Sequence, residues 1–226
     1  MYKLTVSLLS LFLVVAANAQ ESGNKIISRF EFVAGPSFSN NTGYLNNYDS
    51  KTGYSFGVGY YQKLYKSFSL NVRALHEMKG SVANYPYGAA DETGVITEIN
   101  DKYTTEFNYL TLYLFPTLQL GKNKNLYLGA GGYYSFLRRL SVSTFRTNKE
   151  TGEFISESTT TDPHYFDPTF DAGVAFQAGY SFNVSSKIQL MLQAFINRGL
   201  VDLHNDYPMG SQRNNTFGIL LSARIR

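Results

Sequence analysis

The sequence predicts an all-β protein, an eight-stranded antiparallel up-and-down transmembrane β-barrel. Four observations predict this fold class. Eight segments alternate between apolar and polar residues with a period of two, the pattern of strands with two different faces. The charged residues inside these segments all share the polar side, and the connections between segments alternate between short and long. Tyr and Phe, which favour strands, account for 15% of the 226 residues.

The first four segments place apolar residues at every second position. Segment 30–38 sets Phe and Ala against Arg, Glu, Gly and Ser, and segment 54–60 sets Tyr, Phe and Val against Ser and Gly. Segment 68–74 sets Phe, Leu, Val and Ala against Ser, Asn and Arg. Segment 110–120 sets Leu against Tyr, Thr, Phe and Gln, so each segment is expected to form one strand.

The last four segments repeat the pattern. Segment 126–136 sets Leu, Ala and aromatic residues against Gly, Tyr and Ser, and segment 170–180 sets Phe, Ala, Val and Tyr against Asp, Gly and Gln. Segment 188–196 sets Ile, Leu and Ala against mainly Gln. Segment 217–225 sets Phe, Ile, Leu and Ala against Gly, Ser and Arg.

The distribution of charge along the strands favours a membrane barrel over a soluble one. Lys or Arg on a lipid face at mid-bilayer costs roughly 2 to 4 kcal/mol, so charges are expected to face the lumen. All the charges assigned to the strands lie on the polar parity, and they are Arg29, Glu31, Arg73, Glu77, Asp171 and Arg224. The apolar parity therefore is expected to face lipid and the polar parity to face the lumen.

Connection lengths give an independent indication. Bacterial barrels alternate short periplasmic turns with long outer loops. Short connections are expected at 64–67, 121–125 and 183–187. The other connections are long and are expected outside the cell, at 40–51, 80–106, 138–168 and 199–214.

Composition excludes several function classes. Without Cys the chain has no disulfide, no thiolate zinc site and no cysteine nucleophile. The net charge of +3 is small and dispersed, which excludes a nucleic-acid-binding surface. The sequence indicates no cofactor.

The N-terminus predicts export and sets the domain boundaries. Residues 1–19 combine a basic start, an apolar run and the small-residue pattern Ala17-Asn18-Ala19, as cleaved signal peptides do. The run is shorter than the roughly 20 apolar residues of a transmembrane helix. Residues 20–27 are expected to form a periplasmic segment and residues 28–226 the barrel.

Two prolines fall inside predicted strands. Pro36 and Pro116 cannot donate to a ladder, and a closed barrel has no edge to hold them. We expect β-bulges at both positions.

Several motifs resemble one known family. Segment 108–116, which ends Tyr-Leu-Phe-Pro, and the glycine strand 126–131 resemble consecutive strands of the PorT-like outer-membrane β-barrel family. Segments 76–80, 170–173 and 197–203 resemble its lysine-glycine, aspartate-x-glycine and glycine-leucine motifs, in the same order along the chain. The resemblance implies an eight-stranded barrel in the bacterial outer membrane and, through the family's namesake, an association with secretion.

The residues best suited to catalysis lie beyond the seventh strand. Asp202, His204 and Asp206 share one parity, and an aspartate-histidine pair at a barrel rim activates water in outer-membrane proteases. The same side chains form an incomplete ligand set for a divalent cation. Neither His76 nor His164 has a recognisable nucleophile partner. We expect no enzyme and no metal site, with a surface hydrolase using His204 as the alternative.

The lumen charges form a structural network in this interpretation. An eight-stranded barrel has an interior that side chains fill, so paired charges and tyrosines close it. The network residues are Arg29, Glu31, Arg73, Glu77, Lys79, Asp171 and Arg224. A narrow solute channel remains the alternative.

The long loops carry the function in the main hypothesis. They place tyrosines among Asn, Thr, Gly and Asp, as recognition loops do. These tyrosines are Tyr44, Tyr48, Tyr85, Tyr87, Tyr103, Tyr165 and Tyr207. We expect a monomeric barrel, surrounded by outer-membrane lipid, that engages a protein partner in the envelope during assembly, secretion or surface recognition.

Overall fold

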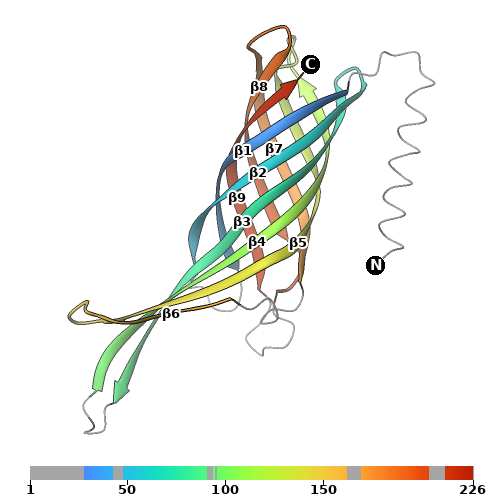
Figure 1. The fold of residues 1–226 in the computed structure, drawn as a ribbon. Coiled ribbons are helices and arrows are strands. Elements are labelled where there is room, and N and C mark those ends of the chain that lie inside the picture. Colours follow the sequence, from blue (N-terminus) through green and yellow to red (C-terminus); the bar gives the residue numbers. More distant parts are fainter. Residues whose placement is uncertain are drawn as a thin grey trace.

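The computed structural model consists of antiparallel strands (Figure 1). It describes residues 28–42, 48–90, 94, 96–161, 169–203 and 212–225. The predicted signal peptide, 1–19, and the predicted periplasmic segment, 20–27, lie outside these ranges. The described strands are β1 (Ser28–Thr42), β2 (Tyr48–Tyr65), β3 (Phe68–Ala90), β4 (Ile96–Leu120), β5 (Leu126–Asn148), β6 (Phe154–Thr160), β7 (Phe170–Asn183), β8 (Ile188–Gly199) and β9 (Arg213–Ile225).

Eight of these strands close into a ring. They pair in the order β4-β3-β2-β1-β9-β8-β7-β5, and a pairing of β4 with β5 completes the circle. Every pair is antiparallel. A closed ring lets the strands satisfy one another's backbone groups without an edge, as a membrane span requires. The predicted eight-stranded antiparallel barrel is confirmed.

The two faces of the ring follow the predicted parity. Along β8, exposed and buried side chains alternate almost without interruption. In β1, Phe32 is 58% exposed whereas the neighbouring Glu31 is 1% exposed. The apolar side chains therefore form an outer band and the polar side chains fill the interior.

Cross-strand registers bring outward side chains near the outer end of the apolar band next to one another on five strands, β2, β3, β4, β5 and β7. His76 pairs with Phe56 of β2 and with Leu110 of β4, and Phe136 of β5 pairs with Leu110 and with Phe170 of β7. On β5 the outer face becomes polar beyond Phe136, where the exposed Arg138 and Arg139 follow. Arg198 of β8 and Asn215 of β9, which pair with each other, are polar outward positions near the outer ends of their strands. These residues mark the boundary between the spanning barrel and the outer mouth.

Three strands continue beyond the barrel as a projecting sheet (Figure 1). β3 and β4 stay paired up to Ala90 and Ile96, and β5 pairs first with β4 and then with β6. We call this part, residues 83–90, 96–105, 141–148 and 154–160, the projecting sheet. The expectation of loops throughout 80–106 and 138–168 is therefore wrong. Thr, Tyr, Ile and Val favour strands here, and strands already held in the barrel extend their ladders without an apolar face.

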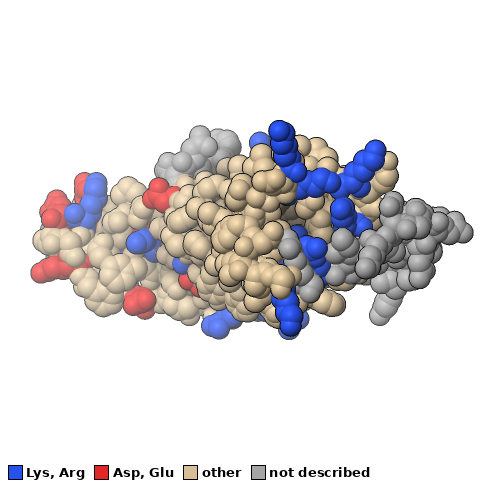
Figure 2. Space-filling model, turned by 90° about the horizontal axis from the view of Figure 1, so that it is seen from above, with Lys and Arg blue, Asp and Glu red and all other residues tan. Residues whose placement is uncertain are grey.

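The short connections lie where the sequence predicts them. β2 ends at Tyr65 and β3 starts at Phe68, and the β4–β5 and β7–β8 connections are similarly short. Lys66 and Lys124 adopt positive φ angles of 40° and 53° in two of these turns. Seen from this end, the molecule shows Lys and Arg gathered around the short turns, and acidic side chains with some Lys or Arg among them at the opposite end of the view (Figure 2).

The prediction of bulges at the two prolines is wrong. The β1–β9 ladder omits the pairings of Gly35 and Pro36 but resumes at Ser37 in the same register. The β4–β5 ladder omits Phe115 and Pro116 in the same way. Proline removes one donor, and the remaining register tolerates the gap because the pairs on both sides hold it. Register shifts lie elsewhere. One lies opposite Asn108 and Tyr109, where β5 carries the extra residue Arg138, and the β2–β3 ladder has two more, between Ser50 and Ser55 and between Lys63 and Tyr65.

Candidate functional site

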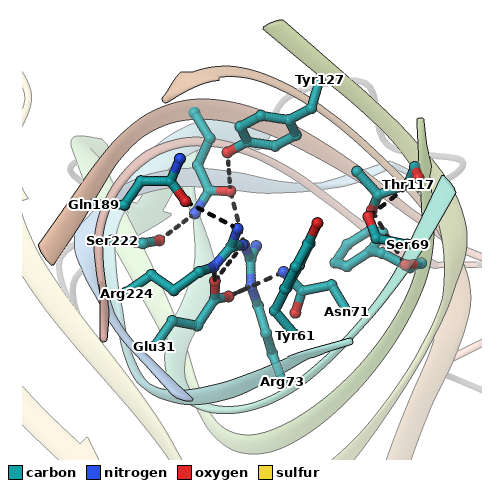
Figure 3. A network of polar contacts seen from close by, with 12 residues as sticks. Glu31, Tyr61, Ser69, Asn71, Arg73, Thr117, Tyr127, Gln189, Ser222 and Arg224 are labelled. Atoms are coloured by element: carbon teal, nitrogen blue, oxygen red, sulfur yellow. Dashed lines mark hydrogen bonds and ion pairs between the residues drawn. The ribbon is translucent and has the colours of Figure 1, made fainter. Parts of the chain in front are cut away.

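The lumen holds a first cluster of charges around Glu31, which we call the Glu31 cluster (Figure 3). Oε1 of Glu31 accepts hydrogen bonds from Nε of Arg73 at 2.7 Å and from Nδ2 of Asn71 at 3.0 Å. Oε2 of the same carboxylate accepts from Nη2 of Arg224 at 2.9 Å. One carboxylate thus holds two guanidinium groups, from β3 and β9, against β1.

Glutamines complete the bonding of the two arginines. Nη1 and Nη2 of Arg73 donate to Oε1 of Gln177 and of Gln193, both at 2.9 Å. Tyr127 donates to the same Gln193 oxygen at 2.8 Å. The guanidinium of Arg224 lies 3.8 Å from the ring centroid of Tyr61. Buried charges persist only when paired and hydrogen-bonded, and the Glu31 cluster meets that requirement.

An apolar layer separates this cluster from the outer half of the lumen. Inward side chains from seven strands pack together in it, with Tyr113 and Phe115 stacked at 5.3 Å. Its members are Val33, Leu75, Tyr113, Phe115, Tyr133, Ala175, Phe195 and Leu220. Toward the short turns, a cavity of only about 10 Å³ lies beside Arg224, which is about the space of one water molecule.

A second cluster, which we call the Lys79 cluster, lies on the outer side of this layer. Nζ of Lys79 lies 3.4 Å from Oε2 of Glu77 and 3.7 Å from Oδ2 of Asp171. Tyr113 donates to Glu77 at 2.8 Å, and Tyr133 donates to Asp171 at 3.1 Å. One cation here lies beside two carboxylates, whereas in the Glu31 cluster one carboxylate binds two cations.

Six of the seven predicted network residues are therefore placed in two separate clusters rather than one. Glu31, Arg73 and Arg224 form the first, and Glu77, Lys79 and Asp171 form the second. Arg29 faces inward nearer the short turns, paired in the ladder with Tyr61. The neutral partners of these charges and tyrosines were not predicted as part of the network, and they are Asn71, Gln177, Gln193 and Asn197. Their inward parity was a signal that could have found them.

Four of the predicted loop tyrosines gather at the outer mouth. Tyr85 and Tyr87 lie on β3 and Tyr103 on β4, at positions that continue the inward parity of the barrel onto the projecting sheet. Tyr48 starts β2 and pairs with Ala83 beside them. We call these four side chains the tyrosine face. Tyr44, Tyr165 and Tyr207 lie outside the described residues.

The ion pair between Asp101 and Arg146 supports the tyrosine face. Nε and Nη2 of Arg146 each donate to one oxygen of Asp101 at 2.8 Å, a bidentate arrangement. Tyr87 and Tyr103 donate to Oδ2 of Asp101 at 3.4 and 3.3 Å. The Arg146 guanidinium also lies 5.8 Å from the ring centroid of Tyr87. The pair therefore fixes two tyrosines across β3, β4 and β5.

The pKa values around this brace follow its contacts. Hydrogen bonds from Arg146 hold the pKa of Asp101 below its usual 3.8, against the opposing effect of burial. Burial, with the nearby Asp101 carboxylate, raises the pKa of Tyr103 above 10.0. Burial, with a hydrogen bond to Tyr85, raises the pKa of Tyr48 to about 12. Both tyrosine hydroxyls remain protonated at neutral pH and keep their donor capacity.

A cleft of about 160 Å³ opens between these tyrosines. Tyr48, Tyr85 and Tyr103 form its aromatic walls, and the rings of Tyr85 and Tyr103 meet edge to face at 5.4 Å. Ser81, Ala83 and Thr105 complete the lining. This cleft and the tyrosine face form the candidate functional site, because they combine apolar faces with hydroxyl groups at the outer mouth.

The predicted catalytic group lies mostly outside the described residues. His204 and Asp206 fall there, as does His164. Asp202 is described, and its Oδ1 accepts a hydrogen bond from the backbone N–H of Gln212 at 2.8 Å. Its carboxylate thus anchors the start of β9.

His76 lies on the outer face, as its parity predicts. Its ring packs edge to face against Tyr54 and Phe56 at 5.9 and 5.2 Å. This aromatic group stands at the outer boundary of the apolar band, where amphipathic rings are common in barrels.

Two features are absent from the described part of the chain. No three His, Cys, Asp or Glu side chains in it are grouped closely enough to hold a metal ion. Nor does that part contain a helix long and apolar enough to cross a membrane.

Sequence comparison decides the family. The family model of the outer membrane protein β-barrel domain matches residues 18–205. The chain belongs to this family. It is therefore an integral β-barrel protein of the bacterial outer membrane, with the exposed apolar band in lipid and the clusters above in its lumen. Comparison with curated proteins gives no match.

Solved outer-membrane barrels align with this family member over most of their length. The attachment invasion locus protein Ail of Yersinia pestis, in complex with the heparin analogue sucrose octasulfate, is 8% identical, with a TM-score of 0.37 and coverage of 88% of this chain and 99% of Ail. Neisserial surface protein A is 12% identical, with a TM-score of 0.39 and coverage of 87% and 96%. OprG from Pseudomonas aeruginosa is 10% identical, with a TM-score of 0.34 and coverage of 88% and 94%.

Proposed function

We propose that this barrel is a non-enzymatic, monomeric recognition protein whose lumen is closed and whose tyrosine face engages a partner outside the cell. The observation that carries the proposal is the position of Tyr85, Tyr87 and Tyr103 on one face of the projecting sheet, braced by the Asp101–Arg146 pair, with Tyr48 of β2 beside them. Rigid amphipathic tyrosines provide large contact area at low entropic cost. A strand-borne face also holds its side chains more firmly than a loop does.

The packing of the lumen supports a closed barrel. Phe115 and Leu220 of the apolar layer are each only 2% exposed, and the charges on either side of the layer are bound to one another. A solute path needs unfilled polar space along the axis. The outer mouth and the projecting sheet, rather than the lumen, are therefore the surfaces left for function.

The motif resemblance supports a role in the envelope. The residues that resemble the PorT-like family include segment 76–80, at the point where β3 leaves the barrel for the projecting sheet. An association with secretion or assembly fits a barrel that presents a braced sheet beyond the membrane. Within this proposal the partner is a component of the cell envelope or a molecule met at the cell surface.

Site-specific photocrosslinking tests the proposal. A photoreactive residue replacing Tyr85 is expected to capture a partner in living cells. The same residue replacing Tyr65, which is 56% exposed at the end of β2 beside a short turn, should not capture it. Equal capture at both positions, or at neither, would overturn the recognition role of the tyrosine face.

A second substitution separates recognition from hydrolysis. His204→Ala removes the only histidine of the predicted Asp202, His204 and Asp206 group. Capture at Tyr85 and the cellular phenotype should both survive this change. Loss of the phenotype with capture intact would favour a surface hydrolase.

A further inference from the structure

The cleft within the tyrosine face has a chemistry of its own. Its lining holds no charged residue: Tyr48, Ser81, Ala83, Tyr85, Tyr103 and Thr105 supply only rings, a methyl group and hydroxyls. Two ion pairs lie on residues beside the lining, Asp101 with Arg146 and Lys51 with Glu106 at 2.9 Å. Asp49 and Lys102 adjoin Tyr48 and Tyr103 in the chain but lie on the opposite parity of their strands. A charged ligand would therefore enter without a counter-charge and lose its hydration.

The same lining argues against a purely apolar ligand. Ser81 and Thr105 present hydroxyl groups among the rings. An alkyl chain in the cleft would cover these hydroxyls without giving them partners, at a cost of desolvation. The ligand must offer both an apolar face and several hydroxyl or amide groups.

A pyranose ring offers both features. Its axial C–H groups form an apolar face that stacks on an aromatic ring, while its hydroxyls exchange hydrogen bonds at the edge. Two rings that meet edge to face, Tyr85 and Tyr103, give such a sugar one surface to lie on and one to abut. The cleft volume of about 160 Å³ suits one sugar ring with its substituents.

The fold fixes these groups before any ligand arrives. Tyr103 is held by Asp101, and Nε2 of Gln212 donates to the Tyr48 hydroxyl at 2.6 Å. β3 and β4 are paired without interruption on both sides of the cleft. Preorganised side chains lose little entropy on binding, which matters for a small ligand with few contacts.

From this chemistry we infer that the cleft binds a single uncharged sugar residue of a glycan at the cell exterior. The inference rests on the proposed recognition role and names the ligand class of that site. The sugar belongs either to a glycan of the same cell's outer membrane or to a glycan met from outside. Both present the same pyranose chemistry to the cleft.

Saturation-transfer NMR on the full chain in lipid nanodiscs tests this inference. The probes are maltohexaose, chitotriose, a mannose oligosaccharide and the saccharide released from the outer-membrane glycolipid of the producing strain. Irradiation of the aromatic protons should transfer saturation to ring C–H protons of at least one probe. The identity of that probe distinguishes the cell's own glycan from an external one.

Variants assign the signal to the cleft. Tyr85→Ala and Tyr103→Ala are expected to weaken binding about tenfold or more, because each removes a wall of the cleft. Tyr85→Phe keeps the ring and loses the hydroxyl, so it should retain the stacking signal with weaker affinity. Tyr65→Ala is the matched control and should bind like the wild type. Heat-modifiable migration in gels verifies that each variant folds.

The outcomes separate this inference from the function on which it rests. Absence of transfer to every probe, or transfer that Tyr85→Ala and Tyr103→Ala leave unchanged, overturns the sugar site. If photocrosslinking at Tyr85 then captures a protein, recognition stands and the ligand class is wrong. If it captures nothing, both fail.

Discussion

Nε of Arg73 lies 2.7 Å from Oε1 of Glu31, and neither side chain is more than 1% exposed. The two residues come from β3 and β1, which do not pair with each other, so their contact spans the lumen face of β2. Gly59 of β2 pairs with both residues, and a Cβ there would approach the Glu31 side chain to 2.7 Å. A residue without a side chain on β2 thus permits the ion pair.

Removing the carboxylate of this pair should strongly destabilise the barrel. Glu31→Gln leaves Arg73 and Arg224 buried without a counter-charge, and breaking a buried pair costs about 3 to 5 kcal/mol. Urea unfolding in lipid vesicles measures the change. Adding Arg224→Gln should recover part of the loss, because one excess charge disappears.

The control for this prediction is an exposed carboxylate of the same type. Glu150 lies in the β5–β6 turn, and Glu150→Gln should change the unfolding free energy by less than about 0.5 kcal/mol. Exposed ion pairs contribute only about 0 to 1 kcal/mol to stability. If Glu31→Gln lowered the unfolding free energy by less than about 1 kcal/mol, the Glu31 cluster would not hold the barrel together.

Acid should loosen the projecting sheet before the barrel. The pKa of Asp101 is lowered in the fold, so its ion pair stabilises the sheet above its usual pKa of 3.8 and this stability is lost as pH falls through the lowered value. Hydrogen exchange of residues 141–148, corrected for intrinsic rates, should therefore accelerate several-fold at pH 3. Asp101→Asn should show that faster exchange already at pH 7 and no further acid step.

Alkaline pH should also loosen the projecting sheet, through Tyr103 rather than Asp101. The pKa of Tyr103 is raised above 10.0, so its protonated hydroxyl stabilises the sheet below pH 10 and this contribution is lost as pH rises further. Tyr103→Phe should lack the alkaline step in exchange. An unchanged step in that variant would assign the transition to another group.

Gly131 lies opposite the place where the β4–β5 ladder omits its pairings, and it should tolerate no side chain. A Cβ on Gly131 would overlap the carbonyl oxygen of Leu114, just before the omitted pairings of Phe115 and Pro116. Gly131→Ala should cost about 1 to 3 kcal/mol, as overpacking does. The adjacent Gly132 is the control: a Cβ there meets only the oxygen of Gly173, at 3.5 Å. Equal effects of the two substitutions would contradict the close strand approach.

A closed lumen predicts that the protein conducts no ions. The wild-type protein should give no conductance steps in planar bilayers over many insertions, because the apolar layer fills the axis. Replacing Tyr113, Phe115 and Phe195 together by Ala should produce small steps. Steady conductance of the wild-type protein would favour the solute channel instead.

Parity predicted the barrel because one physical constraint acts on every strand. A charge such as Arg73 or Glu31 is costly in lipid, so its position in the sequence reveals which face is inward. The same constraint says nothing about which inward residues meet. Gln177 and Gln193 reach Arg73 from strands that lie across the lumen, and only the closed ring brings them together.

The projecting sheet and its tyrosines could not be predicted in this way. Segment 83–90 contains Pro86 and Gly88, which are disfavoured in strands, and segment 96–105 carries charges on both parities, so neither shows the apolar alternation of the barrel segments. Their strand structure depends on pairing with neighbours already held in the barrel. The prediction of bulges at the prolines was wrong for a related reason. Pairs on both sides of Pro36 and Pro116 fix the register, so no bulge is needed.

Site-directed spin labelling measures most directly which face meets lipid. The chain has no Cys, so single substitutions carry unique labels. Labels at Leu112→Cys and Leu192→Cys, both outward, should collide with oxygen dissolved in the bilayer and not with a water-soluble nickel complex. A label at Ser135→Cys, which is inward and buried, should be shielded from both. Collision of the nickel complex with the labels at 112 and 192 would contradict the assignment of this face to lipid, and with it the whole account.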